Sequence, residues 1–317
     1  MNGQLEQFSV AICIATYRRP RGLEALLASL DALQFTGVEP ALTLVIVENC
    51  VKEPASDTLG DISALSRWPV LYISEPERGI VSARNRALIS APADVDYIAF
   101  VDDDETVSQG WMDAMLNTIK TTKATAVQGP VLPSYESPPP AWIDELKIFQ
   151  LGPFIEGEQL DFAATNNSLI DATFLRKQNL RFDFQFNNSG GEDEELYGRL
   201  RNAGGTIRAS AEAVVTDAVP TNRMTFRWVL RRQFRKGNTL GRIALLRRSG
   251  RIKRLAKAIL ANGYGVVLVL TLGFGSRARF FTGFFEIARG CGMIAAFGRI
   301  RFEEYSTGAV LSDRSSR

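Results

Sequence analysis

The first half of the chain alternates short apolar runs with helical stretches, and this alternation constrains the fold more than any other feature. The apolar runs have the length and β-branched content of strands, and they are expected at residues 8–15, 42–47, 70–73, 97–101 and 124–131. The helical stretches lie between and after them, at residues 20–33, 80–89 and 110–120. Strands spaced by helices predict an α/β fold with a mostly parallel, doubly wound sheet and helices on both faces.

The later part of the chain is less regular. A proline-rich loop at 133–140, interpreted as a substrate-side flap or a rim, precedes a possible strand at 162–170. Helices are expected at 192–201 and 224–246.

Polar residues follow three of the predicted strands. Thr16 and Tyr17 come after the first strand, Glu48 and Asn49 after the second, and the acidic run Asp102–Glu105 after the fourth. Ligands of doubly wound sheets bind beyond the carboxyl ends of the strands. The sequence therefore predicts a binding site at this edge of the sheet.

The chain has no histidine, which excludes whole classes of mechanism. Neither a Ser-His-Asp or Cys-His mechanism nor a zinc site with imidazole ligands can be built. A general base is expected to be a carboxylate, with Lys, Tyr or Cys as the alternatives. A catalytic metal would have oxygen ligands, as Mg²⁺ or Mn²⁺ prefers. The three scattered cysteines, Cys13, Cys50 and Cys291, favour a reducing compartment.

Two acidic motifs are the main candidates for chemistry. In Asp102-Asp103-Asp104-Glu105, Asp102 and Asp104 would point to the same side of an extended segment and could share a divalent ion, or one could hold a ribose. The alternative is a solvated acidic turn. In the second motif two glycines precede Glu192 and Asp193, where a helix start would stabilise an ionised base. The alternative there is an ordinary acidic first turn.

A third motif, Glu77-Arg78-Gly79 through Asn85, carries Arg84 one turn into a predicted helix. Arg84 could reach a phosphate or a base at the same sheet edge. A surface ion pair is the alternative.

The ordered set of motifs resembles glycosyltransferase family 2, with the GT-A fold, over roughly residues 8–240. The matching motifs are Ala15-Thr16-Tyr17-x-Arg19-Pro20, Val47-Glu48-Asn49, Gly79-x-x-x-Ala83-Arg84-Asn85, Phe100-Val101-Asp102-x-Asp104, Thr165-Asn166-Asn167 and Gly191-Glu192-Asp193. The tail, with Arg231-Arg232-x-x-Arg235-x-Gly237 and then apolar segments, is similar to the branch that builds bacterial exopolysaccharides on lipid carriers.

This resemblance implies a role for each matching residue. Asp193 would be the general base, and Asp104 would bind Mn²⁺ or Mg²⁺. The nucleotide-sugar side would be formed by Thr16, Tyr17, Arg19, Glu48, Asn49, Arg84, Asp102 and Asp103. The acceptor or donor-sugar side would be formed by Trp142, Asn167, Glu192, Arg232 and Arg235.

The family usually has Asp where Glu48 stands, so the base preference is open, and uridine is implied by resemblance alone. The Gln-x-x-Arg-Trp motif of processive members is missing, because Gln233 is followed by Phe234, Arg235 and Lys236. A single, inverting sugar transfer is expected.

Residues 221–257 carry thirteen Lys/Arg and no Asp or Glu, and apolar segments follow at 258–275 and 280–297. A basic segment beside an apolar one fits an anionic membrane surface, or the diphosphate of a lipid-linked acceptor, better than nucleic acid. We expect a catalytic domain over residues 1–222 and a helical membrane-associating region over 223–317. The region would be peripheral or a monotopic hairpin on the cytoplasmic face of the membrane.

Three other functions compete with this interpretation. A phosphohydrolase of the haloacid dehalogenase type would use Asp102 as nucleophile and Asp104 as acid/base, but it leaves Arg84 without a role. A membrane-attached scaffold would bind cations without turnover. A nucleotidyltransferase would need a Gly-rich basic loop near the start, of which residues 18–22 are a faint version.

Overall fold

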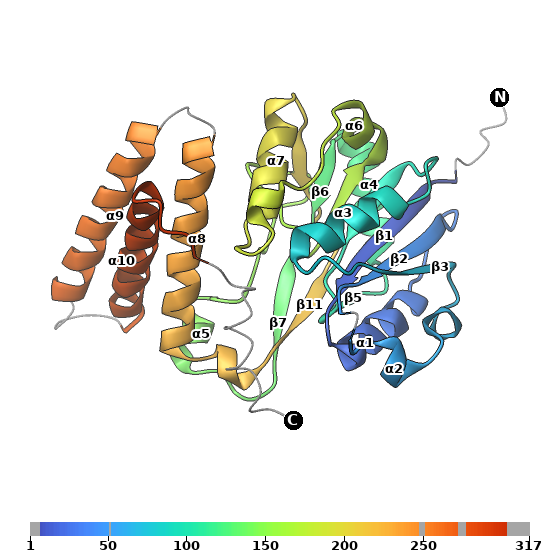
Figure 1. Cartoon of the computed structure of the whole chain (residues 1–317), viewed down its shortest axis with the longest axis horizontal. Helices are drawn as coiled ribbons and strands as arrows, with labels where there is room; N and C mark the ends of the chain where they lie inside the picture. Colours follow the sequence, from blue (N-terminus) through green and yellow to red (C-terminus); the bar gives the residue numbers. More distant parts are fainter. Residues whose placement is uncertain (1–6, 51, 247–250, 272–276, 303–317) are drawn as a thin grey trace. The chain divides into compact units, whose positions relative to one another are not determined.

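The computed structural model describes residues 7–50, 52–246, 251–271 and 277–302 (Figure 1). The chain divides into two compact units. The sheet unit comprises Met1–Ser134, Gln150–Asn187 and Glu192–Ala218. The helical unit comprises Tyr135–Phe149, Asn188–Gly191 and Val219–Arg317.

An eight-stranded sheet in the order β3-β2-β1-β4-β9-β6-β10-β8 is the centre of the sheet unit. Its strands are β1 (Ser9–Thr16), β2 (Ala41–Glu48), β3 (Val70–Ser74), β4 (Tyr97–Phe100), β6 (Ala126–Gln128), β8 (Gln159–Leu160), β9 (Ser168–Asp171) and β10 (Ile207–Ala209). The first four strands run parallel, and β10 runs parallel to β6. The predicted α/β class and mainly parallel sheet are confirmed, with β9 and β8 reversed relative to their neighbours.

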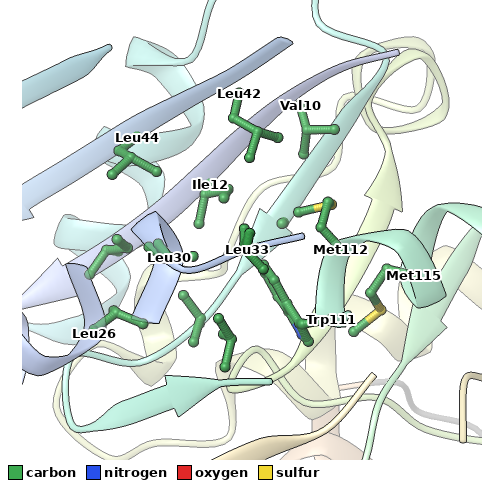
Figure 2. Packing of buried hydrophobic residues seen from close by; sticks show 14 of the residues in the cluster. Val10, Ile12, Leu26, Leu30, Leu33, Leu42, Leu44, Trp111, Met112 and Met115 are labelled. Carbon is green, nitrogen blue, oxygen red and sulfur yellow. The ribbon is translucent and has the colours of Figure 1, made fainter. Parts of the chain in front are cut away.

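Helices cover both faces of this sheet. On one face, α1 (Pro20–Asp31) and α4 (Trp111–Thr122) pack on Val10 and Ile12 of β1 (Figure 2). Ile14 belongs to the same core cluster. On the other face, α3 (Ile80–Ser90) packs on β1 and β2. Alternate residues of β1 point to opposite faces, so a strand that is apolar at nearly every position is buried on both.

Helix α1 shows why these residues become helical. Pro20 stands at its first turn, where a missing N–H costs nothing, and its leucines recur at three- and four-residue spacing. Leu23, Leu26, Leu27 and Leu30 are all buried in the core. The helix therefore presents one continuous apolar stripe to the sheet.

Two predicted strands are wrong in extent. The run at 124–131 forms β6 and then β7 (Val131–Tyr135), because Gly129-Pro130 interrupts the ladder and Pro130 has no N–H to donate. The run at 162–170 becomes a strand only at Ser168. The loop expected from 133 begins three residues later, since β7 joins β5 (Glu105–Val107) and β11 (Val215–Val219) in a three-stranded sheet.

Within the described part of the sheet unit, the remaining elements are four short helices and α7, which forms where a helix was predicted at 192–201. They are α2 (Ser56–Leu59), η1 (Ile62–Leu65), α6 (Ala172–Lys177), η2 (Phe184–Phe186) and α7 (Glu192–Asn202).

The helical unit contains α5 (Ala141–Glu145), η3 (Thr221–Arg223), α8 (Phe226–Leu246), α9 (Arg251–Thr271) and α10 (Arg277–Phe297). Helix α10 packs against both α8 and α9, and glycines make these approaches very close. A Cβ on Gly237 of α8 would lie 1.8 Å from the Arg289 carbonyl oxygen, and one on Gly292 would lie 1.9 Å from that of Phe234.

Among the described residues, α10 is the one helix that is long and apolar enough to cross a membrane, and a third of its apolar window is buried inside the chain. Part of the predicted tail, Arg247, Arg248 and residues 272–275, lies outside the described residues.

Candidate active site

The strand register brings the polar residues together at one edge of the sheet. Thr16 at the end of β1 pairs with Glu48 at the end of β2, and Glu48 pairs with Ser74 of β3. On the other side of β1, Cys13 pairs with Phe100, after which β4 ends and the acidic run begins. The loops that follow β1, β2 and β4 therefore leave the sheet side by side.

Arg19, in the loop after β1, pairs with two acids in the loop after β4. Its Nη1 lies 2.8 Å from Asp103 Oδ1 and 2.9 Å from Asp104 Oδ2. The backbone N–H of Tyr17 also donates to Asp103, at 3.3 Å. Burial raises the pKa of Asp103 to about 6, although the nearby Arg19 guanidinium acts in the opposite direction. Asp104 is more accessible, with 22% of its side chain exposed.

The acidic run forms a turn, so the expectation that Asp102 and Asp104 point to one side of an extended segment is wrong. The Glu105 carboxylate accepts the backbone N–H of Asp102 at 2.8 Å, and the Glu105 N–H donates back to the Asp102 carbonyl oxygen at 3.2 Å. These two bonds close the turn. As a result Asp102 bonds Arg84, whereas Asp103 and Asp104 bond Arg19.

Glu105, like Asp103, is a buried member of this run, and the sequence did not distinguish either from its neighbours. Glu105 is 2% exposed. Burial raises the pKa of Glu105 well above its ordinary value, and the nearby carboxylates of Asp102, Asp217 and Asp104 raise it further. Its role in the structure is to fix the Asp102 backbone.

Arg84 joins the acidic turn to the start of α7. Its Nη2 lies 2.9 Å from Asp102 Oδ1, and its Nη1 pairs with the Glu192 carboxylate. Arg84 and Glu192 are both buried, while Asp102 is about one-third exposed. Of the two expectations for Arg84, the structure shows the ion pair, and it is buried rather than on the surface.

Asp193 follows Glu192 in the first turn of α7. Its Oδ1 accepts the N–H of Glu194 at 2.7 Å, and the residue is partly exposed. Four acids occupy this turn, where unsatisfied N–H groups and the helix dipole stabilise negative charge. A partly exposed carboxylate at this position can accept a proton from a bound hydroxyl.

The turn that leads into α7 requires two glycines. Gly190 and Gly191 have φ of +71° and +92°, a region that other residues rarely adopt. A Cβ on Gly191 would lie 2.1 Å from Cγ2 of Thr239 on α8. Arg242 of the same helix donates to the Ser189 hydroxyl, and both side chains are buried. Sequence reasoning found the glycines but not Thr239 or Arg242, because their partners lie about fifty residues away.

Glu48 and Asn49 are buried and bonded to the protein itself. Glu48 accepts the N–H groups of Cys50 at 2.9 Å and Ala55 at 2.7 Å. Burial raises its pKa, and these backbone hydrogen bonds partly counter the rise. The Asn49 amide donates to the carbonyl oxygens of Glu75 and Glu77, and its oxygen accepts the Gly79 N–H. Both residues hold loops in place at the edge where a base pocket was expected.

Asn167 is fully buried, at 0% exposure. It accepts a hydrogen bond from Trp111 Nε1 at 2.8 Å and donates to the carbonyl oxygens of Pro130 and Ala213 at 2.9 and 2.7 Å. The polar atoms of the Asn167 side chain are therefore occupied inside the protein.

Thr16 is buried beside the acidic turn, and Tyr17 lies between two arginines. The guanidinium carbons of Arg18 and Arg78 lie 5.4 and 5.2 Å from the Tyr17 ring centroid. Sequence reasoning assigned no role to these arginines. The Nε of Arg18 also lies 3.3 Å from Glu53 Oε2.

Asn187 is a further residue that sequence reasoning missed. Its Oδ1 accepts the N–H groups of Val81 and Ser82 at 2.9 and 3.0 Å, and its Nδ2 donates to the Arg78 carbonyl oxygen. It therefore caps the start of α3, the helix that carries Arg84, from a distant part of the chain. No local pattern could have shown this.

Three predicted sugar-side residues belong to the helical unit. Trp142 stacks on Phe281 with ring centroids 4.8 Å apart. The Arg232 guanidinium lies 5.3 Å from the Phe149 ring and 5.5 Å from the Trp228 ring, and Arg235 is half-buried on α8.

The carboxylates fit a metal ion that is shared with a substrate rather than one held by the protein alone. Within residues 7–302, gaps aside, no three Cys, Asp or Glu side chains converge as a metal site. Asp102 and Asp104 are partly exposed oxygen donors, and Mg²⁺ is commonly held by one or two carboxylates together with substrate phosphates.

Comparison with known proteins places this site in a family. Residues 11–179, which include Arg84 and the whole acidic turn, match the family described as Glycosyl transferase family 2. The succinoglycan biosynthesis protein ExoM of Rhizobium meliloti (strain 1021) is 35% identical over 239 residues, which cover 75% of this chain and 76% of that protein.

Two more distant similarities were found. The glucosyl-dolichyl phosphate glucuronosyltransferase of Haloferax volcanii is 26% identical over 139 residues, 43% of this chain and 42% of that protein. The crystal structure of S. aureus TarS 1-349 superposes with a TM-score of 0.49 at 12% identity, covering 96% of this chain and 98% of the other.

Proposed function

This chain belongs to glycosyltransferase family 2, and from that premise we propose that it transfers one sugar from a nucleotide sugar to a lipid-linked saccharide. The transfer is one step in the synthesis of a cell-surface polysaccharide, by analogy with its succinoglycan-pathway relative. A nucleotide-sugar donor and a saccharide acceptor follow from the family. The uridine nucleotide, the inverting outcome and the lipid carrier are parts of the proposal.

One observation carries the assignment of the site. Arg84 bonds Asp102, in the turn after β4, and Glu192, at the start of α7. Asp102 on the donor side and Glu192, the residue before the candidate base Asp193, are therefore joined through a single guanidinium. A transferase needs this proximity, because the proton acceptor must act on a hydroxyl that attacks the carbon bound to the nucleotide.

On the donor side, Asp102 contacts the nucleoside and Asp104 holds the ion. Glycosyltransferase family 2 generally uses divalent metal ions, and Mn²⁺ or Mg²⁺ is the proposed ion here. When bound, such an ion stabilises the negative charge of the departing diphosphate. Tyr17 and Arg19 line the nucleotide pocket from the loop after β1. Arg19 also keeps Asp103 and Asp104 paired, which limits the repulsion between adjacent carboxylates.

Several predicted contacts are better understood as supports. We propose that Thr16, Glu48, Asn49 and Asn167 shape the donor pocket from behind, since all four are buried. Arg84 orients Asp102, and Glu192 orients Arg84. These are positioning residues rather than groups that touch the donor.

On the acceptor side, Asp193 takes the proton of the attacking hydroxyl. The hydroxyl oxygen forms a bond to the anomeric carbon from the face opposite the diphosphate, and the carbon–phosphate oxygen bond breaks. The nucleoside diphosphate leaves with the electron pair, so one displacement inverts the configuration. Trp142, Arg232 and Arg235 are the proposed contacts to the acceptor's sugar or its diphosphate.

The catalytic role is assigned to residues 1–222 and membrane association to residues 223–317, at the cytoplasmic face. An apolar helix of spanning length and the exopolysaccharide relative are compatible with membrane association. The phosphohydrolase and the scaffold are not favoured, since the family match covers the motif on which both depended.

The test is a screen of nucleotide sugars with Mn²⁺ or Mg²⁺, with and without membrane lipid extract, that measures release of nucleoside diphosphate. We expect release from one donor, stimulated by extract, lost with a chelator, and much reduced in Asp104→Asn. Activity that survives complete metal removal contradicts the role of Asp104. Inorganic phosphate released without acceptor would instead indicate a phosphohydrolase.

A further inference from the structure

Helix α9 exposes a continuous stripe of large apolar side chains. Its members are 45–85% exposed, and they are Ile252, Ile259, Leu260, Val266, Val267 and Leu270. The pair Ile259-Leu260 recurs seven residues later as Val266-Val267, with Ile252 seven residues before Ile259 and Leu270 four after Val266. All six therefore share one face of the helix. A protein in water rarely leaves such a face uncovered without a partner for it.

The opposite face of α9 is fixed against α10. Ala258 is 1% exposed, and a Cβ on Gly265 would lie 2.6 Å from the Gly283 carbonyl oxygen. Helix α10 contacts both α8 and α9, while α8 and α9 contact each other little (Figure 1). The stripe therefore points away from the helical unit.

Basic residues border the stripe. Residues 251–271 carry four cations, all within the first two turns, and no acid. Lys253 and Lys257 are exposed on one flank, and Tyr264 lies on the same flank at 59% exposure. An apolar face flanked by Lys and Tyr suits the headgroup layer of an anionic bilayer, where ammonium groups meet phosphate and tyrosine is favoured.

The arrangement favours a helix that lies in the interface over one that crosses the membrane. The apolar part of α9, Leu255–Thr271, is shorter than the roughly 20 residues that a span needs. Helix α10 is long enough, but Gly283 and Gly292 on two of its sides are pressed against its neighbours. A symmetric dimer through α9 would bring the same lysines together with no acid in the helix to neutralise them.

We propose that α9 docks in the plane of an anionic lipid bilayer, with this stripe at the boundary between headgroups and acyl chains. This inference rests on the proposed function, because that function includes an acceptor that is carried on a lipid. It adds the helix, the face and the orientation by which the chain reaches that lipid.

The test is flotation of the full chain with vesicles of neutral phosphatidylcholine, with and without phosphatidylglycerol. Leu260→Gln combined with Leu270→Gln should lower the partition coefficient on the order of tenfold or more, because both side chains lose their lipid contact. Lys253→Gln combined with Lys257→Gln should lower it on the order of tenfold for anionic vesicles only. The matched control is Ile155→Gln, an isoleucine of the sheet unit that is 74% exposed, against 72% for Leu260.

The proposal is overturned if the leucine variant floats like the wild type, or if Ile155→Gln falls equally. A wild-type dimer that the leucine variant dissociates, without vesicle binding, would assign the stripe to a second copy. Resistance of the bound chain to alkaline carbonate would show a span instead.

Nucleoside diphosphate release in detergent should be unchanged in all three variants. Its absence in the wild type would count against the proposed function but leave the vesicle result intact.

Discussion

Arg84 on α3 and Glu192 at the start of α7 form a buried ion pair although 108 positions separate them in the chain. The pair fixes the distance between two helices that carry opposite halves of the proposed site. Removing only the cation would leave a buried carboxylate without its charge partner, which is costly.

The first prediction concerns this pair. Arg84→Met should lower the free energy of unfolding by about 3–5 kcal/mol, as observed when one partner of a buried pair is removed. Adding Glu192→Gln should recover part of that loss, because the unpaired charge is then gone. Unfolding in urea measures both. Equal stability of the single and double variants would show that the pair is not energetically coupled.

The second prediction concerns the proposed base. Asp193→Asn should reduce sugar transfer about 10²–10⁴-fold, since an amide cannot accept the acceptor's proton. Donor affinity, measured by calorimetry with Mn²⁺, should remain within a few-fold of the wild type. Glu194→Gln, the exposed neighbour in the same helical turn, is the control and should keep its activity. Comparable losses in both variants would point to helix disruption rather than to a base.

The third prediction separates backbone strain from packing at Gly191. Gly191 and Gly204 have φ of +92° and +90°, but a Cβ on Gly204 meets nothing within 4 Å. Gly204→Ala should cost only about 1–2 kcal/mol of stability, from its backbone conformation. Gly191→Ala should cost about 1–3 kcal/mol more, because its Cβ collides with Thr239. The additional Thr239→Ala should restore much of this difference, and thermal unfolding of the three variants tests the contact.

The fourth prediction is a pH dependence at Glu105. The pKa of Glu105 is raised in the folded protein, first by burial, above its ordinary value of 4.5. Such a group stabilises the fold while protonated, and the contribution is lost as the pH rises through the folded pKa. Glutamine cannot ionise and keeps an oxygen for the Asp102 N–H.

The stability of Glu105→Gln relative to the wild type should therefore increase as the pH rises above about 4.5. Melting curves in chelator from pH 4 to 8 give this difference. Glu24→Gln, an exposed position, should show no such trend. A difference that is flat or falls with pH would mean that Glu105 is ionised in the fold throughout.

The strands were predictable because their apolar runs are long enough to be buried on both faces. The direction of β9 was not predictable, because the sequence of its four residues, Ser168–Asp171, does not show whether the strand runs parallel or antiparallel to its neighbours. Its reversal is set by the hydrogen bonds that β4 and β6 offer on either side. The division of the predicted strand 124–131 into β6 and β7 was predictable from Gly129-Pro130, since proline cannot donate a hydrogen bond to a neighbouring strand.

At the site, the sequence predicted that the polar residues lie at strand ends. It did not predict which residues they would bond to. Arg84 could have faced a phosphate, and only the tertiary structure shows that it faces two carboxylates. Asn167 reads as an exposed polar residue, yet its amide is used entirely by backbone and Trp111. A polar side chain can bind a ligand or form hydrogen bonds inside the protein. Its residue type alone does not show which of the two it does.

The close approach of α10 to its neighbours limits how this chain can be shortened. A version ending near residue 246, made to improve solubility, would strip α8 of the helix on which Gly237 rests. The same α8 supports Gly191 through Thr239, so the damage would extend to the turn that precedes the base. Soluble protein for enzymology is better sought by changing surface leucines of α9 than by cutting the chain.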